Sequence, residues 1–257
     1  MLVSFETPIS QLQISQTYND YDYALVHLFE KYPEYLKYFE NSVKTRRMYL
    51  DNSLFELGSA YDNDKFKHYC KHFGDINSKN FYYIVPDCLN DCQQTIENFI
   101  EFSKYPINGG VIGVAQGDDF KSTLDCFFFM KQRCDIVAIS FGYNWFEDYG
   151  EGDNIHQKRM NARQKFIHEL NHFNLLEGVQ IHLLGCALPQ EFKAYKDIPN
   201  IVSIDTSNPI VHGILNIPYS EQGLNTKMDV KLADLIEWDG DFTIALENAK
   251  KFKEINL

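Results

Sequence analysis

The sequence lacks the features that mark membrane, secreted and zinc-ribbon proteins. No stretch approaches the roughly 18 consecutive apolar residues of a membrane-spanning helix, and the start, MLVSFETPIS, has neither a basic region nor a long apolar run. None of the six cysteines belongs to a CxxC pair. We therefore expect a cytoplasmic protein without a membrane partner, whose scattered thiols stay reduced.

Positive charge is also scarce, since 24 Lys and Arg residues stand against 36 Asp and Glu residues, for a net charge of −12. Because binding to polyanions needs clustered Lys and Arg, any nucleic-acid contact must come from a local basic patch or from a partner. Two clusters are candidates for phosphate contact. They are Lys44, Arg46 and Arg47, and Lys158, Arg159 and Arg163.

What the sequence does contain is a regular alternation. Short apolar runs end in small or polar residues, and longer stretches with helical periodicity follow them. The apolar runs are Leu2–Phe5, Met48–Leu50, Phe81–Val85, Val111–Ala115, Asp135–Ser140, Val179–Leu184 and Ile201–Ile204. The helical stretches are Asp91–Ser103, Asn161–Leu176, Asp241–Glu254 and Tyr18–Glu40, the last predicted to hold two helices broken near Pro33.

This alternation predicts an α/β protein with a parallel sheet covered by helices, because nearly continuous apolar strands are buried on both faces. Seven or eight such units in 257 residues favour a single-domain (β/α)8 TIM barrel over residues 1–257, with an irregular or incomplete eighth unit. An open, doubly wound sheet is the alternative.

Small or polar residues stand at the C-terminal ends of the predicted strands. They are Asp51, Asp87, Gln116, Gly142, Gly185 and Asp205. In a barrel these ends converge on the face that carries active sites, although turns after strands also favour Asp and Gly. Carboxylates without a His, Cys or Lys cluster indicate chemistry at a glycosidic carbon, without a metal or cofactor. A carboxylate with a carboxamide also suits the edge of a purine, on which Phe55 would stack.

Six segments resemble, in order, the motifs of the tRNA-guanine transglycosylases. They are MYLDNSLFELG, IVPDC, GVAQGDD, AISFG, IHLLGCALPQEF and IVSIDTSNPIVHG, within about residues 45–215. The corresponding family motifs are DSGGFQ or DSGGYQ, a strand ending in Asp, GxVQGG, a Gly-rich strand end, LxGxGxP and DxxxPTR. Members of this family are barrels that exchange a guanine base for a 7-deazaguanine.

The resemblance implies a role for each matching residue. Asp205 would be the nucleophile at C1′ of the nucleoside, and Asp51 the general base that deprotonates the incoming base. The residues implied to bind the base are Asp87, Gln116, Gly117, Gly142, Phe55, Leu184 and Gly185. The resemblance implies no catalytic metal and no cofactor.

The chain departs from the family pattern at several positions. Ser53 and Leu54 replace two glycines, Val211 replaces an Arg, and no cysteine follows Cys186, so the family's zinc subdomain is missing. These departures resemble the shorter DpdA-type members of phages and bacterial islands, which place 7-deazaguanines such as preQ0 in DNA. The resemblance thus implies DNA rather than tRNA as the polymer, with a protein partner or homodimer as a further source of positive charge. A tRNA-guanine transglycosylase-like enzyme, a nucleoside hydrolase acting on modified nucleosides and a non-catalytic binding subunit stay open.

A rival motif lies in a predicted helix. His168, Glu169 and His172 match HExxH, in which the two histidines bind zinc and the glutamate acts as base. Glu191 is a candidate third ligand. So loose a pattern also arises by chance, and a helix of the barrel's outer ring lies far from the strand ends. A zinc metalloprotease is therefore the alternative of another class.

Overall fold

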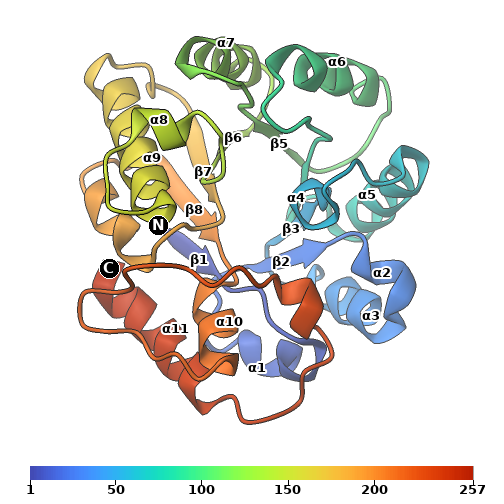
Figure 1. Cartoon of the computed structure of the whole chain (residues 1–257). Helices are drawn as coiled ribbons and strands as arrows, with labels where there is room; N and C mark the ends of the chain where they lie inside the picture. Colours follow the sequence, from blue (N-terminus) through green and yellow to red (C-terminus); the bar gives the residue numbers. More distant parts are fainter. Residues whose placement is uncertain (257) are drawn as a thin grey trace. The chain divides into compact units, whose positions relative to one another are not determined.

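The computed structural model describes residues 1–256, which form two compact units (Figure 1). Unit 1 contains Met1–Asp20 and the chain from Ser140 onward, and unit 2 contains Tyr21–Ile139. The eight strands have the order β1-β8-β7-β6-β5-β4-β3-β2. This is the cyclic order of a (β/α)8 barrel, interrupted between β1 and β2, and the strand pairs within each unit are parallel. The predicted fold class is confirmed, whereas the single domain stays a prediction.

Unit 2 alternates short buried strands with helices. Its strands are β2 (Asp22–Leu25), β3 (Met48–Asp51), β4 (Phe81–Ile84), β5 (Gly110–Val114) and β6 (Ile136–Ser140), whose last residue opens the second segment of unit 1. Its helices are α2 (Leu28–Lys31), α3 (Pro33–Ser42), α4 (Leu54–Leu57), α5 (Asn63–Asn77), α6 (Cys92–Phe102) and α7 (Phe120–Lys131). The helices α5, α6 and α7 begin after Asp62, Asp91 and Asp119, whose side chains accept backbone N–H groups of the first turn.

The prediction for Tyr18–Glu40 is wrong in part. This segment contains strand β2 ahead of α2 and α3, and Pro33 is the first residue of α3. The four residues of β2, DYAL, lack a β-branched run and include a charge. The Asp22 carboxylate is nevertheless buried, because it accepts hydrogen bonds from Ser42 and Arg46. These distant partners leave no signal in the local sequence.

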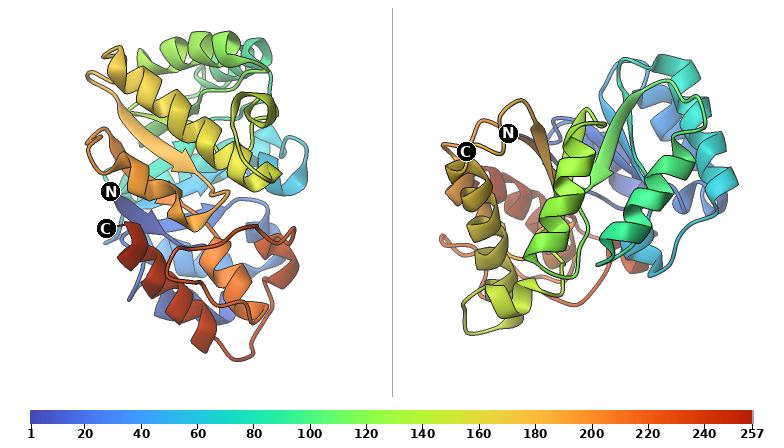
Figure 2. Two further views of the ribbon diagram at one scale, coloured as in Figure 1. Left: turned by 60° about the vertical axis from the view of Figure 1, so that its left-hand side comes forward. Right: turned by 90° about the horizontal axis from the view of Figure 1, so that it is seen from above.

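Unit 1 joins the two ends of the chain. Its strands are β1 (Leu2–Ser4), β7 (Gln180–Leu184) and β8 (Ile201–Asp205), in the order β1-β8-β7. Its helices are α1 (Leu12–Ser15), α8 (Phe146–Tyr149), α9 (Ile155–His172), α10 (Asn208–Ile214) and α11 (Thr243–Asn256), with the 3-10 turns η1 (Ile9–Gln11), η2 (Pro189–Tyr195) and η3 (Leu232–Leu235). Helix α9 runs along β7, and α11 packs against α10 (Figure 2). The eighth unit is irregular, because a long stretch separates the short α10 from α11.

The cysteines behave as expected from their spacing. All six are free thiols, and Cys70, Cys126 and Cys186 are buried. Burial raises the pKa of Cys186 to about 12, so this thiol is held as a neutral core group. None of the helices in the described part of the chain combines the length and apolarity that crossing a membrane requires.

Candidate active site

The predicted site residues lie at or just after the C-terminal ends of strands, and the two units carry different members of the set. In unit 2, Asp51 ends β3, while Asp87 follows β4 and Gln116 follows β5. In unit 1, Leu184 and Asp205 end β7 and β8, and Gly142 and Gly185 follow β6 and β7. The strand-end placement predicted from the sequence is therefore confirmed for each of these residues.

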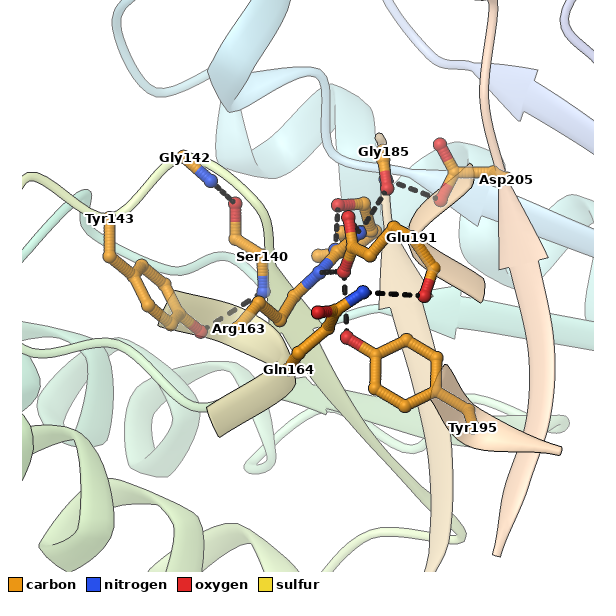
Figure 3. Close-up of polar contacts among 10 residues, drawn as sticks. Ser140, Gly142, Tyr143, Arg163, Gln164, Gly185, Glu191, Tyr195 and Asp205 are labelled. Atoms are coloured by element: carbon orange, nitrogen blue, oxygen red, sulfur yellow. Dashed lines mark hydrogen bonds and ion pairs between the residues drawn. The ribbon is translucent and has the colours of Figure 1, made fainter. Parts of the chain in front are cut away.

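The carboxylate of Asp205 is fixed through one of its two oxygens. Oδ1 accepts a hydrogen bond of 3.3 Å from the backbone N–H of Gly185 (Figure 3). Nε2 of His182 lies 3.0 Å from the same oxygen. The side chain is only 6% exposed. Within residues 1–256, Oδ2 accepts no hydrogen bond. The N–H of Gly185 thus orients the carboxylate through Oδ1 alone.

His182 is a fully buried residue that the sequence analysis did not single out. In the parallel pairing of β7 and β8 it lies opposite Ser203, and its Nδ1 is 3.0 Å from the Ser203 hydroxyl. Its Nε2 lies 3.0 Å from Oδ1 of Asp205, but this contact does not form a hydrogen bond in the structure. The available signal was a histidine between Ile181 and Leu183, two residues before the strand ends.

A buried ion pair holds the turn after β7. Arg163 of α9 donates from Nε and Nη2 to the two carboxylate oxygens of Glu191, at 2.6 and 3.0 Å, and both side chains are completely buried. The same guanidinium donates to the carbonyl of Leu184 at 3.0 Å and to that of Gly185 at 2.9 Å (Figure 3). Because the N–H of Gly185 bonds Asp205, this ion pair supports the main chain that fixes the carboxylate.

These contacts correct two predictions. Arg163 makes no phosphate contact, because it is buried and its donors are taken up within the protein. Burial alone would lower the pKa of Arg163, but the charge of Glu191 outweighs this and holds the pKa above its usual value. Glu191 is not a third zinc ligand, because Arg163 and the hydroxyl of Tyr195, at 2.7 Å, occupy its carboxylate.

Gly185 needs its lack of a side chain. Its φ of 61° is left-handed, and a Cβ at this position would lie 2.6 Å from the ring of Phe141. Gly142 is one of the residues implied by the resemblance to bind the base, and its backbone N–H donates to the Ser140 hydroxyl at 3.1 Å. Tyr143 accepts from the N–H of Ser140 at 3.1 Å, so this turn is ordered by its own side chains.

Asp87 and Gln116 are brought together in unit 2. The carboxylate of Asp87 accepts from Nδ2 of Asn52 at 2.8 Å and from Nε2 of Gln116 at 2.6 Å. The Gln116 carbonyl accepts from the N–H of Asn90 at 3.1 Å. Burial raises the pKa of Asp87, and the two amide hydrogen bonds oppose that rise. The pair predicted to bind a base edge is therefore preorganised by mutual contacts.

Asp51 starts a tight turn where the resembling family has glycines. Its carboxylate accepts from the hydroxyl of Tyr23 and from the N–H of Ser53. Ser53 has a left-handed φ of 62°, so it adopts the backbone conformation that a glycine favours. Phe55 is 47% exposed, as a stacking surface requires. Gly117 packs against α7, where a Cβ would lie 2.3 Å from the backbone nitrogen of Thr123.

The first basic cluster lies at the wrong end of its strand for contact near Asp51. Lys44, Arg46 and Arg47 precede β3, whereas Asp51 ends it. Nε of Arg46 is 3.3 Å from a carboxylate oxygen of Asp22, and Nζ of Lys44 donates to the side chain of Asn41 at 2.9 Å. These cations therefore serve the structure around the start of β3.

The HExxH motif is not assembled into a metal site in the part of the chain that the structure describes. His168 and His172 are exposed on α9. No group of three His, Cys, Asp or Glu side chains within residues 1–256 is arranged to hold a metal ion. A hydrogen bond between Tyr149 and Glu169 helps burial to raise the pKa of Tyr149, so Glu169 is engaged by a neighbouring helix.

Comparison with known proteins assigns no family to this chain. No family model matches the sequence. No curated protein matches it either. The site is therefore interpreted from its own geometry and from the motif resemblance.

Proposed function

We propose that this protein is a base-exchanging transglycosylase that replaces guanine in DNA with a 7-deazaguanine base such as preQ0. The observation that carries the proposal is the carboxylate of Asp205, which is buried at the end of β8 with Oδ1 bonded by the N–H of Gly185 and 3.0 Å from Nε2 of His182. Such a carboxylate, with its other oxygen available, suits attack on an acetal-like carbon. The ordered motifs resembling the tRNA-guanine transglycosylases support the same role.

The reaction has two displacements. Oδ2 of Asp205 forms a bond to C1′ while the bond from C1′ to the guanine nitrogen breaks, and the electron pair leaves with guanine, which takes up a proton. The incoming base loses a proton and attacks C1′, and the electrons of the C1′–Oδ2 bond return to Asp205. We assign both proton transfers to Asp51, acting first as acid and then as base.

Base recognition is assigned to the cluster in unit 2. A guanine-type base presents N–H donors along one edge. Each carboxylate oxygen of Asp87 accepts one amide hydrogen bond and still has a second lone pair with which to accept from the base. Gln116 adds a donor and an acceptor, and the exposed ring of Phe55 offers a stacking surface. The proposal therefore uses hydrogen-bond types that match the substrate edge.

A second candidate is the hydrolysis or exchange of free modified nucleosides. The positions of the basic residues favour it, because Lys44, Arg46 and Arg47 lie at the opposite end of β3 from Asp51 and Arg163 is buried. Of the two predicted clusters, only Lys158 and Arg159, in the first turns of α9, stay candidates for phosphate contact. A polymer substrate then needs further phosphate contacts from a protein partner or a homodimer.

The test is exchange of labelled guanine and labelled preQ0 into three separate substrates: guanine-containing DNA, tRNA and deoxyguanosine. Incorporation into DNA, with a covalent adduct at Asp205 after denaturation, is the expected result. Incorporation into tRNA alone overturns the choice of polymer. Release of base from deoxyguanosine without incorporation supports the second candidate, and no reaction with any substrate by the folded protein overturns both.

Matched variants separate the carboxylate's role from folding. Asp205→Asn retains an oxygen for the Gly185 N–H but removes the nucleophile, and it should abolish exchange and adduct formation. Asp239→Asn changes an exposed Asp of the same unit and should exchange at the wild-type rate. Thermal unfolding of both variants should match the wild type within about 2 °C.

A further inference from the structure

We infer that His182 is a positioning residue that fixes Oδ1 of Asp205 and presents Oδ2 to C1′. The inference rests on the proposed function and extends it to a residue to which the family resemblance gives no role. It follows from three contacts within unit 1. Nδ1 of His182 lies 3.0 Å from the Ser203 hydroxyl, Nε2 lies 3.0 Å from Oδ1 of Asp205, and the N–H of Gly185 reaches the same oxygen at 3.3 Å.

The direction of the contacts follows from which atoms carry protons. A carboxylate oxygen only accepts hydrogen bonds, so Nε2 of His182 must carry the proton that faces Asp205. With Nε2 as the donor, Nδ1 accepts from the Ser203 hydroxyl. Since His182 lies opposite Ser203 in the β7–β8 pairing, the strand register itself aims the ring. The 3.0 Å contact between Nε2 and Oδ1 does not form a hydrogen bond in this structure, and we assign its formation to the substrate complex, since catalytic hydrogen bonds often tighten only when substrate binds.

Ser203, His182 and Asp205 are the residue types of a hydrolase triad, but their burial assigns a different role. Ser203 and His182 are completely buried, so no substrate reaches the hydroxyl. Asp205 is the member of the three with residual exposure. The reactive end of this chain of contacts is therefore the carboxylate, and the histidine acts through it.

Two donors on Oδ1 act mainly on the second displacement. When the C1′–Oδ2 bond breaks, the carboxylate recovers its negative charge, and donors already aimed at Oδ1 stabilise that charge without rearranging. Removing His182 should make Asp205 a poorer leaving group and leave its carboxylate less firmly oriented. Base binding should be little affected, because His182 belongs to β7 and the base-binding assignment rests on Asp87 and Gln116.

The test compares His182→Leu with His182→Gln. Leucine fills the space without a donor, whereas the amide of glutamine restores an N–H near the position of Nε2. We expect His182→Leu to lower kcat by roughly 10- to 100-fold, with KM for the base within about twofold and a longer-lived covalent adduct. His182→Gln should restore at least about half of the lost log kcat. A folded His182→Leu protein with wild-type kcat and adduct lifetime overturns the inference.

A second measurement does not depend on activity. The ¹⁵N shift of His182 Nε2 should differ between the wild type and Asp205→Asn, because the amide replaces a charged acceptor. An unchanged shift overturns the pairing even if exchange occurs. Failure of the proposed function gives a different result. The wild type then exchanges no base, while the ¹⁵N shift of His182 still differs between the wild type and Asp205→Asn.

Discussion

Arg163 and Glu191 form an ion pair that is completely excluded from water, and the same guanidinium binds the carbonyls of Leu184 and Gly185. The contact joins the middle of α9 to the turn that supports Asp205. Burying two charges is expensive, and a buried pair often contributes little net stability. We interpret it as a device that fixes the position of the turn after β7.

The first prediction concerns the loss of one member of this pair. Glu191→Gln leaves the charge of Arg163 buried without its counter-charge, so we expect the free energy of unfolding to fall by about 3–5 kcal/mol. Glu147→Gln is the matched control, because its partner Arg159 lies in the same helix but the pair is partly exposed, and it should cost no more than about 1 kcal/mol. Urea unfolding at neutral pH measures both. Equal losses would contradict the role assigned to burial.

The second prediction separates steric contact from backbone strain at two glycines. Gly185→Ala introduces a Cβ 2.6 Å from the ring of Phe141 at a φ of 61°, and we expect a loss of about 3 kcal/mol with reduced exchange. Gly178→Ala is the control, since its φ of 71° is similar but no atom lies within 4 Å of the added Cβ. It should lose only about 1 kcal/mol. The difference between the two variants reports the contact with Phe141, and a null difference would refute it.

The third prediction is a pH dependence set by Asp87. Burial raises its pKa from the usual 3.8. Between pH 3.8 and the native pKa, the native protein therefore binds more protons than the unfolded chain. The corresponding stability is complete below pH 3.8 and is lost as the pH rises through the native pKa. Urea unfolding at several pH values measures the free energy of unfolding of the wild type and of Asp87→Asn. The wild-type value minus the Asp87→Asn value should decrease with rising pH and then level off. A difference that is constant across the series would contradict the raised pKa.

The fourth prediction concerns His212, whose neutral ring ties two segments together. Its Nδ1 donates to the carbonyl of Asn208 at 2.8 Å, and its Nε2 accepts from the N–H of Met228 at 3.3 Å. Burial lowers its pKa, the hydrogen bond to Asn208 opposes this, and the nearby charges of Lys227 and His156 lower the pKa further. The stability contributed by the neutral ring is complete above pH 6.5 and is lost as the pH falls from 6.5 to the native pKa.

Hydrogen exchange tests this contact. After correction for the intrinsic rate, the amide of Met228 should lose protection as the pH falls below 6.5 through the lowered native pKa of His212, because a protonated Nε2 no longer accepts. The amide of Leu224 donates to the uncharged side chain of Gln190 at 3.1 Å and should change much less. His212→Gln should abolish the pH dependence at Met228. Identical behaviour of the two amides would show that the whole segment opens for another reason.

The sequence predicted features that depend on local pattern. Apolar runs that end in small or polar residues located β3, β4, β5, β7 and β8 together with the residues at their C-terminal ends, because strand burial and turn chemistry leave a periodic signal. The alternation with helices was sufficient to predict the fold class. The roles of Asp205 and Asp51 stay predictions, since they depend on a reaction.

Features that depend on distant partners were not predictable. The buried Arg163 resembled a surface cation, because the sequence does not show that Glu191 lies 2.6 Å away in space. Strand β2 was not predicted, because Asp22 is stabilised by Ser42 and Arg46 rather than by its neighbours in the chain. His182 looked like one more strand residue until the register of β7 and β8 placed it between Ser203 and Asp205.

The pairing of β1 with β8 bears on how the protein is made. Leu2 lies opposite Ser203 and Ser4 opposite Asp205, so strands roughly 200 residues apart in the chain meet side by side. During translation, the contiguous residues of unit 2 emerge from the ribosome before β8 exists, whereas β1 must wait unpaired until Asp205 itself has been synthesised. The strand that carries the proposed nucleophile is thus completed late in synthesis, and partly made chains should have no activity.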